Sequence, residues 1–182
     1  IDDVRRGVVS DPRIGPEFTS PGLGYGGSCF PKDIAELVQT ADRVGMKGVV
    51  LAKAIAESNL RHINGFWFQI DYYHKGRRDS EGDWTSEIRG KTFAVWGLAF
   101  KANTDDVRES PSIAIIQHLL RDGAIIRAYD PKAIVNAKAH KWLTPAGNFY
   151  GKDYGPIANL HYMENKWDAL EGADALIIAT EW

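Results

Sequence analysis

The residues best suited to chemistry lie in one short run, "PGLGYGGSCFPKD", at residues 21–33. This run contains the only cysteine of the chain, Cys29, with four glycines before it and Lys32 and Asp33 after it. The glycines let the backbone approach a ligand closely and permit positive φ angles. A thiol, a cation and a carboxylate in so few residues indicate a candidate nucleophile with charged helpers.

A helix is predicted to begin around Pro31, because proline fits the first helical turn and Ser28 is available as a cap. Unpaired backbone N–H groups and the helix dipole at that end favour a thiolate at Cys29. If the helix includes both, Cys29 and Asp33 lie one turn apart on the same face. The alternative is a small buried hydrophobe in a tight loop. The glycine frame and the helix start favour the nucleophile.

A second run, "GLAFKANTDDVRESP" at residues 97–111, follows a predicted strand. In doubly wound folds ligands bind where strands end, and Lys101 and Arg108 suit phosphate or sugar oxygens. The run has no G-x-G-x-x-G fingerprint. Asp105 and Asp106 could pair on a metal, but no histidine or third acid lies at ligand spacing, so no metal site is expected.

Asp130 closes the next predicted strand as "YDP", where an acid can bind a ribose hydroxyl or cap the following helix. The five histidines show no zinc spacing. His62 and His118 lie in helical stretches and are expected to be structural. A cysteine hydrolase or transferase would need a histidine base near Cys29, and the sequence offers none.

The N-terminal part is predicted to be helical. A short helix covers residues 2–9, a second runs from Pro31 to Gly45, and a long helix spans residues 49–74. The apolar side chains of this long helix form a stripe, and Trp67 makes the stripe wider than one small core would cover. This width favours a homodimer through the helix. A central helix buried within one subunit remains the alternative. The second helix should present one apolar face formed by Ile34, Leu37, Val38, Ala41 and Val44.

The segment 75–91 is charged and aperiodic and is interpreted as a linker. Beyond it the pattern changes to strands alternating with helices, which predicts a parallel sheet with helices on both faces, an α/β fold. The predicted strands are 91–100, 124–130, 159–164 and 174–180, and the predicted helices are 110–123, 131–140 and 166–173.

Composition sets limits on function. The chain has 182 residues, 44% of them hydrophobic, enough for one full domain and part of another. A net charge of −2 offers no field for nucleic acid. Charges interrupt the apolar stretch 49–73, so no membrane span is expected. A single cysteine suggests a cytoplasmic protein. The chain begins without methionine and ends in a strand-like run, so we interpret it as part of a longer polypeptide.

The two runs, together with "RIGPEF" and "AYDPKA", resemble the UDP-glucose/GDP-mannose 6-dehydrogenase family over nearly the whole chain. The resemblance implies a helical central region at 1–75 carrying the cysteine loop and forming the dimer core. A linker at 76–90 and a Rossmann-like UDP-binding domain at 91–182 follow, the latter incomplete at its end. The family's NAD-binding domain, and a lysine and an asparagine used in catalysis, lie outside this sequence.

The resemblance also implies roles for individual residues. Cys29 matches the nucleophile that captures a C6 aldehyde as a thiohemiacetal, which a second NAD-dependent oxidation converts into a thioester that water hydrolyses to the uronate. Asp33 matches the acid that supports water activation. Cys29, Lys32 and Arg108 match positions that contact NAD. The positions matching the sugar-nucleotide pocket are Arg13, Tyr25, Gly26, Phe30, Phe100 and Lys101.

The wording "GGSCFPKD" favours UDP-glucose over UDP-N-acetyl sugars, while GDP-mannose remains an alternative because these motifs do not fix the nucleobase. A second alternative is a nucleotide-sugar binding and dimerisation module without turnover. The chain by itself is expected to be inactive. The segment "FWFQIDYYHKGRRDSEGDW", residues 66–84, departs from the family pattern.

Overall fold

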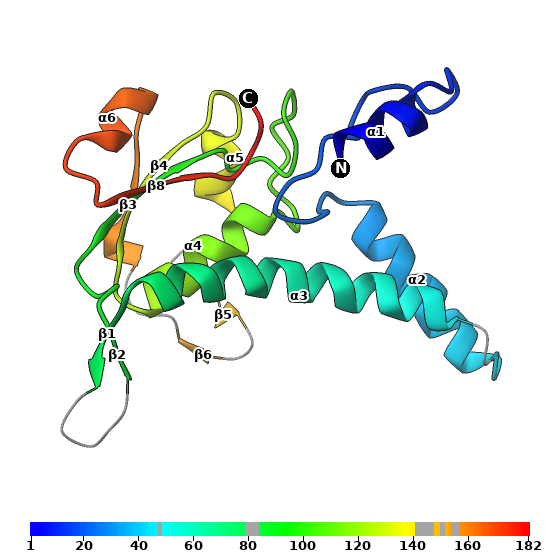
Figure 1. Ribbon diagram of the computed structural model, residues 1–182, viewed down its shortest axis with the longest axis horizontal. Helices are drawn as coiled ribbons and strands as arrows, with labels where there is room; N and C mark the ends of the chain where they lie inside the picture. The colour runs from blue at the N-terminus through cyan, green and yellow to red at the C-terminus, as the bar shows by residue number, and fades with distance from the viewer. Residues whose placement is uncertain (47–48, 79–83, 141–147, 150–151, 154–156) are drawn as a thin grey trace.

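A computed structural model describes residues 1–46, 49–78, 84–140, 148–149, 152–153 and 157–182 (Figure 1). Its N-terminal part is helical, with α1 at Asp2–Val9, α2 at Phe30–Arg43 and α3 at Val50–Tyr73. All three predicted helices are therefore confirmed. Pro31 lies in the first turn of α2, and Gly45, at a φ of 69°, follows its end.

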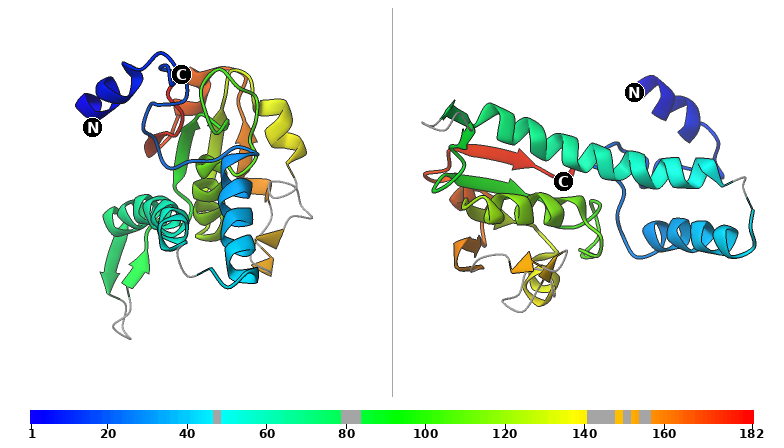
Figure 2. Two further views of the ribbon diagram at one scale, coloured as in Figure 1. Left: turned by 90° about the vertical axis from the view of Figure 1, so that its right-hand side faces the viewer. Right: turned by 90° about the horizontal axis from the view of Figure 1, so that it is seen from below.

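The apolar face predicted for α2 is only partly covered within this chain. Ala41 is buried, and Ile34 and Val38 are half-buried. Leu37 and Val44 remain 52% and 65% exposed. In Figure 2, α2 lies beside the first half of α3, away from the sheet. Half of its apolar face is thus available to another surface.

The long helix α3 crosses the molecule and contacts the C-terminal lobe, residues 88–182, through its second half (Figures 1 and 2). Ile63 is buried in the lobe's core, and Phe66, Trp67 and Ile70 pack against it. The Trp67 ring stacks on His118 of α4 (Pro111–Arg121) at 4.9 Å, and its Nε1 donates to Asp122 Oδ2 at 3.2 Å. These contacts fix α3 on the lobe.

The sheet of the C-terminal lobe is entirely parallel. Its strands are β3 (Thr92–Trp96), β4 (Ile125–Tyr129), β7 (Leu160–Tyr162) and β8 (Ala175–Ile178). They pair in the order β7-β4-β3-β8, which is half of a doubly wound sheet. The predicted parallel sheet is confirmed. β3 is shorter than predicted because Gly97 turns the chain with a φ of 94°.

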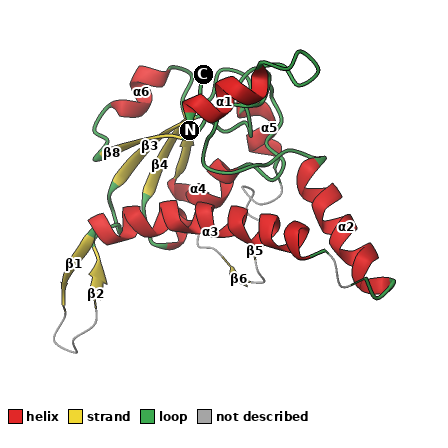
Figure 3. Ribbon diagram, turned by 45° about the vertical axis from the view of Figure 1, so that its right-hand side comes forward, coloured by secondary structure: helices red, strands yellow, loops and turns green. Residues whose placement is uncertain are grey.

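Helices cover the two faces of this sheet (Figure 3). Val95, Ile126 and Ile177 share one face and form the core with α4, Pro111–Arg121. Successive side chains on a strand alternate, so Trp96 faces the other side. There its Nε1 donates to the Lys166 carbonyl of α6, Lys166–Leu170. The remaining helix, α5, spans Ile134–Ala139.

The charged segment after α3 contains strands that its aperiodic sequence did not predict. β1 (Lys75–Arg78) pairs antiparallel with β2 (Trp84–Ser86). The hairpin extends from the end of α3 in Figure 3. Further on, the structure describes a short pair, β5 (Asn148–Phe149) and β6 (Lys152–Asp153), and a 3-10 turn η1 at Ile157–Asn159.

Candidate functional site

Cys29 is exposed at the N-cap position of α2. The Asp33 backbone N–H donates to its carbonyl at 2.8 Å, so both residues belong to the same first turn, as predicted. Lys32 Nζ lies 3.3 Å from Asp33 Oδ1. The predicted capping by Ser28 is wrong, because the helix begins at Phe30 and Ser28 Oγ instead lies 3.6 Å from the Cys29 sulfur. The thiol, the cation and the carboxylate are thus together.

The glycine loop that leads to Cys29, residues 21–28, docks onto the second run of the sequence. The Gly27 N–H donates to the Arg108 carbonyl at 2.9 Å. A Cβ at Gly26 would lie 2.3 Å from the Glu109 carbonyl oxygen, and one at Gly27 would lie 3.0 Å from the Phe100 ring. Only glycine allows this approach. The two runs, distant in sequence, therefore meet in one place.

On its other side the same loop is held by α3. The Tyr25 N–H donates to Asn59 Oδ1 at 2.8 Å, and Asn59 Nδ2 donates to the Tyr25 carbonyl at 3.2 Å. One turn further along α3, His62 Nε2 donates to the Gly22 carbonyl at 3.2 Å. Sequence reasoning missed Asn59. The available signal was an amide four residues before buried Ile63, on the same helix face.

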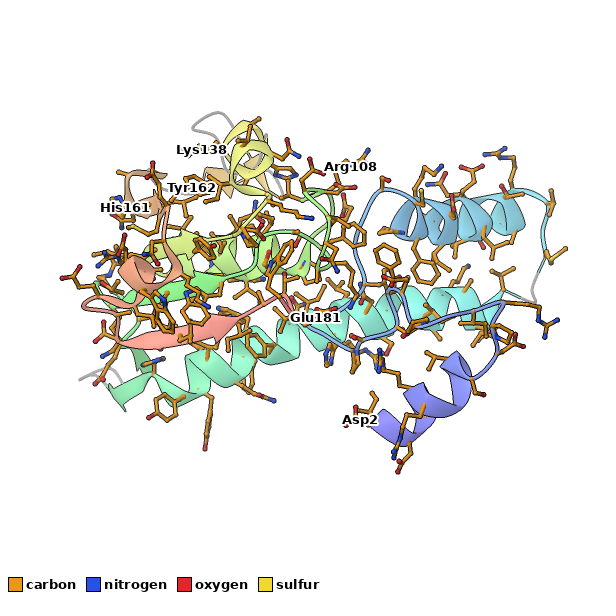
Figure 4. All side chains as sticks on the ribbon, turned by 90° about the horizontal axis from the view of Figure 1, so that it is seen from above. Asp2, Arg108, Lys138, His161, Tyr162 and Glu181 are labelled. Carbon is orange, nitrogen blue, oxygen red and sulfur yellow. The ribbon has the colours of Figure 1, made fainter. Side chains whose placement is uncertain are left out.

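A cleft of about 950 Å³ opens where the start of α2 faces the lobe. Its lining includes Ser28, Lys32, Arg108 and Asn136. Figure 4 places Arg108 at this junction. A second groove, of about 1090 Å³, lies between α2, α3 and α4 and includes Tyr25 and Asn59 in its lining. Lys32 and Arg108, predicted to share one function, thus face the same space.

Arg108 is oriented by Asp106. Its Nε and Nη2 donate to the two carboxylate oxygens at 2.9 and 2.8 Å. This pairing lowers the pKa of Asp106 and raises the pKa of Arg108. Asp106 thus holds the Arg108 guanidinium at the edge of the cleft that Lys32 also lines.

Lys101 is held between two segments that are distant from it in sequence. Its side chain is only 14% exposed, and its Nζ donates to Glu181 Oε1 at 2.9 Å and to the Ser20 carbonyl at 2.5 Å. Its neighbour Phe100 stacks on Phe18 at 6.2 Å. Glu181 lies where the end of the chain meets the loop in Figure 4. The predicted pair of Phe100 and Lys101 therefore adjoins the glycine loop.

Of three further predicted pocket residues, the structure brings Tyr25 and Phe30 together and leaves Arg13 apart. The Tyr25 ring meets the Phe30 ring edge-to-face at 4.6 Å, and burial raises the pKa of the Tyr25 hydroxyl. This contact links the glycine loop to Phe30, the first residue of α2 and the neighbour of Cys29 in sequence. Arg13 is not brought together with them; its side chain is 88% exposed and pairs with Asp11 at 2.6 Å. It lines neither cleft.

Both carboxylate oxygens of Asp130 accept hydrogen bonds from the backbone. It is buried, and its Oδ1 accepts from the backbone N–H groups of Lys132 and Ala133 at 2.8 and 2.7 Å. Its Oδ2 accepts from Leu98 and Ala99 at 2.7 and 3.0 Å. With both oxygens engaged by backbone donors, the carboxylate ties together the loops after β3 and β4.

The described ranges contain no cluster of three or more histidine, cysteine or acidic side chains arranged to hold a metal ion. Among the helices that the structure describes, none has the length and apolar character needed to cross a membrane.

Residues 1–61 match the central domain of the UDP-glucose/GDP-mannose dehydrogenase family, and residues 94–182 match its UDP binding domain. The chain is 40% identical to UDP-glucose 6-dehydrogenase of Pseudomonas aeruginosa and 38% identical to UDP-glucose 6-dehydrogenase YwqF of Bacillus subtilis. Each alignment covers the whole chain but only 36% and 35% of the relative, respectively. The chain thus spans about a third of the length of these relatives.

Two solved structures have the same fold. A UDP-glucose dehydrogenase from the archaeon Pyrobaculum islandicum aligns with a TM-score of 0.71 and 31% identity, over 99% of this chain and 35% of that one. A GDP-mannose dehydrogenase from Pseudomonas aeruginosa aligns with a TM-score of 0.65 and 21% identity, over 100% of this chain and 37% of that one, a likeness of fold alone. The chain belongs to the UDP-glucose/GDP-mannose dehydrogenase family.

Proposed function

We propose that this chain forms the central and UDP-binding parts of an NAD-dependent UDP-glucose 6-dehydrogenase, with Cys29 as its nucleophile. The observation that carries the proposal is the hydrogen bond from the Gly27 N–H to the Arg108 carbonyl. It joins the exposed thiol at the start of α2 to the loop that carries Lys101 and Arg108. The 40% identity to a UDP-glucose 6-dehydrogenase supports the choice of substrate.

The residues of this chain that would hold NAD are Lys32 and Arg108. Both line the cleft beside the start of α2, and their charges fit an anionic dinucleotide. Asp106 holds the Arg108 guanidinium by two hydrogen bonds, so that cation is positioned in advance. When bound, NAD accepts the electron pairs removed from the sugar C6 in two successive oxidations.

Cys29 acts between the two oxidations. Its sulfur attacks the C6 aldehyde and forms a C–S bond, while the aldehyde oxygen takes up a proton to give a thiohemiacetal. Oxidation of this adduct leaves a thioester. Water then attacks the thioester carbon and the C–S bond breaks. This step releases the carboxylate product and regenerates the Cys29 thiolate.

Asp33 supports the hydrolysis. It lies one helical turn from Cys29 and 3.3 Å from Lys32 Nζ, so its carboxylate can accept the proton of the attacking water. The sugar nucleotide is assigned to Tyr25 and Gly26 of the glycine loop and to Phe30, Phe100 and Lys101 outside it. Arg13, which is exposed and paired with Asp11 in this structure, is assigned to the same substrate.

The proposal includes a homodimer through α3. The uncovered apolar side chains of α2 and the N-terminal half of α3 support it, since Leu51 is 73% exposed. Leu51→Asp is expected to shift the full-length protein from dimer to monomer in light scattering. A monomeric wild-type protein would remove this part of the proposal.

The test is an assay of NADH formation by the full-length protein with UDP-glucose, GDP-mannose and UDP-N-acetylmannosamine side by side. UDP-glucose is expected to give the highest kcat/KM. A higher kcat/KM with GDP-mannose would replace the proposed substrate. The 182-residue chain assayed alone is expected to bind UDP-glucose weakly and to form no NADH. NADH formation by this chain alone would contradict the proposal that it forms only the central and UDP-binding parts of the enzyme.

A further inference from the structure

Asn59 has no part in the chemistry proposed above, yet it makes the most complete side-chain contact with the loop that carries Cys29. Its amide both accepts from and donates to the backbone of Tyr25, at 2.8 and 3.2 Å. This is the pairing that a neighbouring β-strand would supply, provided here by one half-buried side chain. We propose that Asn59 is a positioning residue for Cys29, an inference that rests on the proposed function.

The glycine loop can lie close to the Asn59 amide because the residue before Tyr25 is a glycine. Gly24 has a φ of 149°, and a Cβ there would lie 2.7 Å from Asn59 Oδ1 and 3.0 Å from Ile63 Cγ1. Glycine is therefore required next to the paired residue for the loop to lie this close to α3. His62, one turn along, adds a third hydrogen bond at Gly22. The side chains of α3 thus hold the glycine loop in one position by hydrogen bonds and close packing.

Two residues, Tyr25 and Phe30, connect Asn59 to the thiol. The Tyr25 backbone is fixed by the amide, and the Tyr25 ring meets the Phe30 ring at 4.6 Å. Phe30 is the first residue of α2 and follows Cys29 directly. A shift of the Tyr25 backbone therefore moves the start of α2, and the sulfur with it.

The opposite edge of the loop is held by the lobe through Gly27 and Arg108. The loop thus spans two supports, α3 on one side and the run 97–111 on the other. With only the second support, the start of α2 could pivot about Gly27. Because a displacement of about 1 Å can cost a hundredfold in rate, the Asn59 contact is expected to affect turnover more than binding.

The chemistry explains why an amide is present. Tyr25 offers one donor and one acceptor, and asparagine supplies one of each in a short, planar group. Aspartate would retain the acceptor for the Tyr25 N–H and lose the donor to its carbonyl. Alanine would lose both. The aspartate and alanine substitutions therefore remove one and two of the hydrogen bonds to Tyr25, respectively.

The experiment uses the full-length protein and compares Asn59→Ala, Asn59→Asp and Ser58→Ala with the wild type. Ser58 is exposed on the same helix and serves as the matched control. Two quantities are measured: kcat and KM with UDP-glucose per titrated active site, and the alkylation rate of Cys29 by iodoacetamide, resolved by peptide mass spectrometry. The second needs no turnover.

For Asn59→Ala we expect kcat to fall by about tenfold or more with KM within about threefold, because a misplaced thiol reacts slowly but the pocket still binds. The Cys29 alkylation rate should change by at least about threefold, and Ser58→Ala should match the wild type. Asn59→Asp should lie between Asn59→Ala and the wild type. If Asn59→Ala does not fold, the nearly isosteric Asn59→Asp decides by the same readouts.

The proposal fails if an Asn59 variant keeps its kcat per titrated site within about twofold of the wild type and its Cys29 alkylation rate unchanged. A lowered melting temperature with fewer titratable sites but normal kcat per site would assign Asn59 a purely structural role. A Cys29→Ser variant that still forms uronate would instead remove the proposed nucleophile. In that case the alkylation rate still decides whether Asn59 positions the thiol.

Discussion

The backbone N–H of Gly27 donates a 2.9 Å hydrogen bond to the carbonyl of Arg108 and so joins the cysteine loop to the loop after β3. Glu109, the next residue, has a φ of 51°, and its carbonyl oxygen lies against Gly26. A non-glycine residue in this region is strained, and such strain persists only where the surrounding contacts hold it. The junction is therefore specified by both runs together.

Gly26→Ala should break this junction. Its Cβ would lie 2.3 Å from the Glu109 carbonyl oxygen, a backbone atom that cannot move aside without shifting the loop. We expect the free energy of unfolding to fall by about 1–3 kcal/mol, measured by urea denaturation. Gly22→Ala is the matched control, since a Cβ there meets nothing within 4 Å. Equal stability of the two variants would contradict the assigned packing.

Cys29→Ser should stop uronate formation by the full-length protein. A hydroxyl at neutral pH is a far weaker nucleophile than a thiolate, so we expect a loss of more than about a hundredfold. The measurement is uronate produced per enzyme, by chromatography. UDP-glucose binding should persist, because the thiol is exposed and contributes little to packing. Normal uronate production would exclude Cys29 as the nucleophile.

Asp130→Ala should destabilise the lobe strongly. It leaves the backbone N–H groups of Leu98, Ala99, Lys132 and Ala133 without their acceptor. Three of these donors, at Leu98, Ala99 and Ala133, are buried, so at about 1–3 kcal/mol for each the loss should be at least about 3 kcal/mol. Calorimetry should show a melting temperature lower by about 6–12 °C. Asp105→Ala, at an exposed acid of the same lobe, should change little.

Stability should fall as the pH drops below neutrality, in part through His118. Burial lowers the pKa of His118 from its ordinary 6.5, and Arg121 lowers it further while Asp122 opposes them. The unfolded chain therefore binds a proton at a higher pH than the folded chain does. The free energy of unfolding contributed by this group is fully present above pH 6.5 and is lost as the pH falls toward the folded pKa.

His118→Phe tests this pH dependence, since phenylalanine can keep the stacking on Trp67 without titrating. Urea denaturation between pH 5 and 8 should give a smaller slope of stability against pH. A residual slope is expected from His74, whose pKa is lowered mainly by burial. A slope identical to that of the wild type would show that His118 does not contribute.

Much of the secondary structure follows from local patterns. Pro31 and Gly45 mark the ends of α2 because their backbone preferences suit a helix start and a helix stop. The alternation of apolar runs predicts the parallel sheet, since both faces of such strands are covered. The charged run after α3 misleads, because hairpin pairing depends on cross-strand partners rather than on periodicity.

The sequence by itself determined which side chains can do chemistry: a lone thiol at a helix start with Lys32 and Asp33 close to it in sequence, and Arg108 in a second, distant run. Only the tertiary structure decided that Gly27 contacts Arg108, that Asn59 holds the glycine loop and that Asp130 accepts hydrogen bonds from the backbone of two loops. Helix and turn signals act over a few residues, so they can be seen in a single run. Contacts between distant segments depend on how whole elements pack, and no short pattern encodes that arrangement.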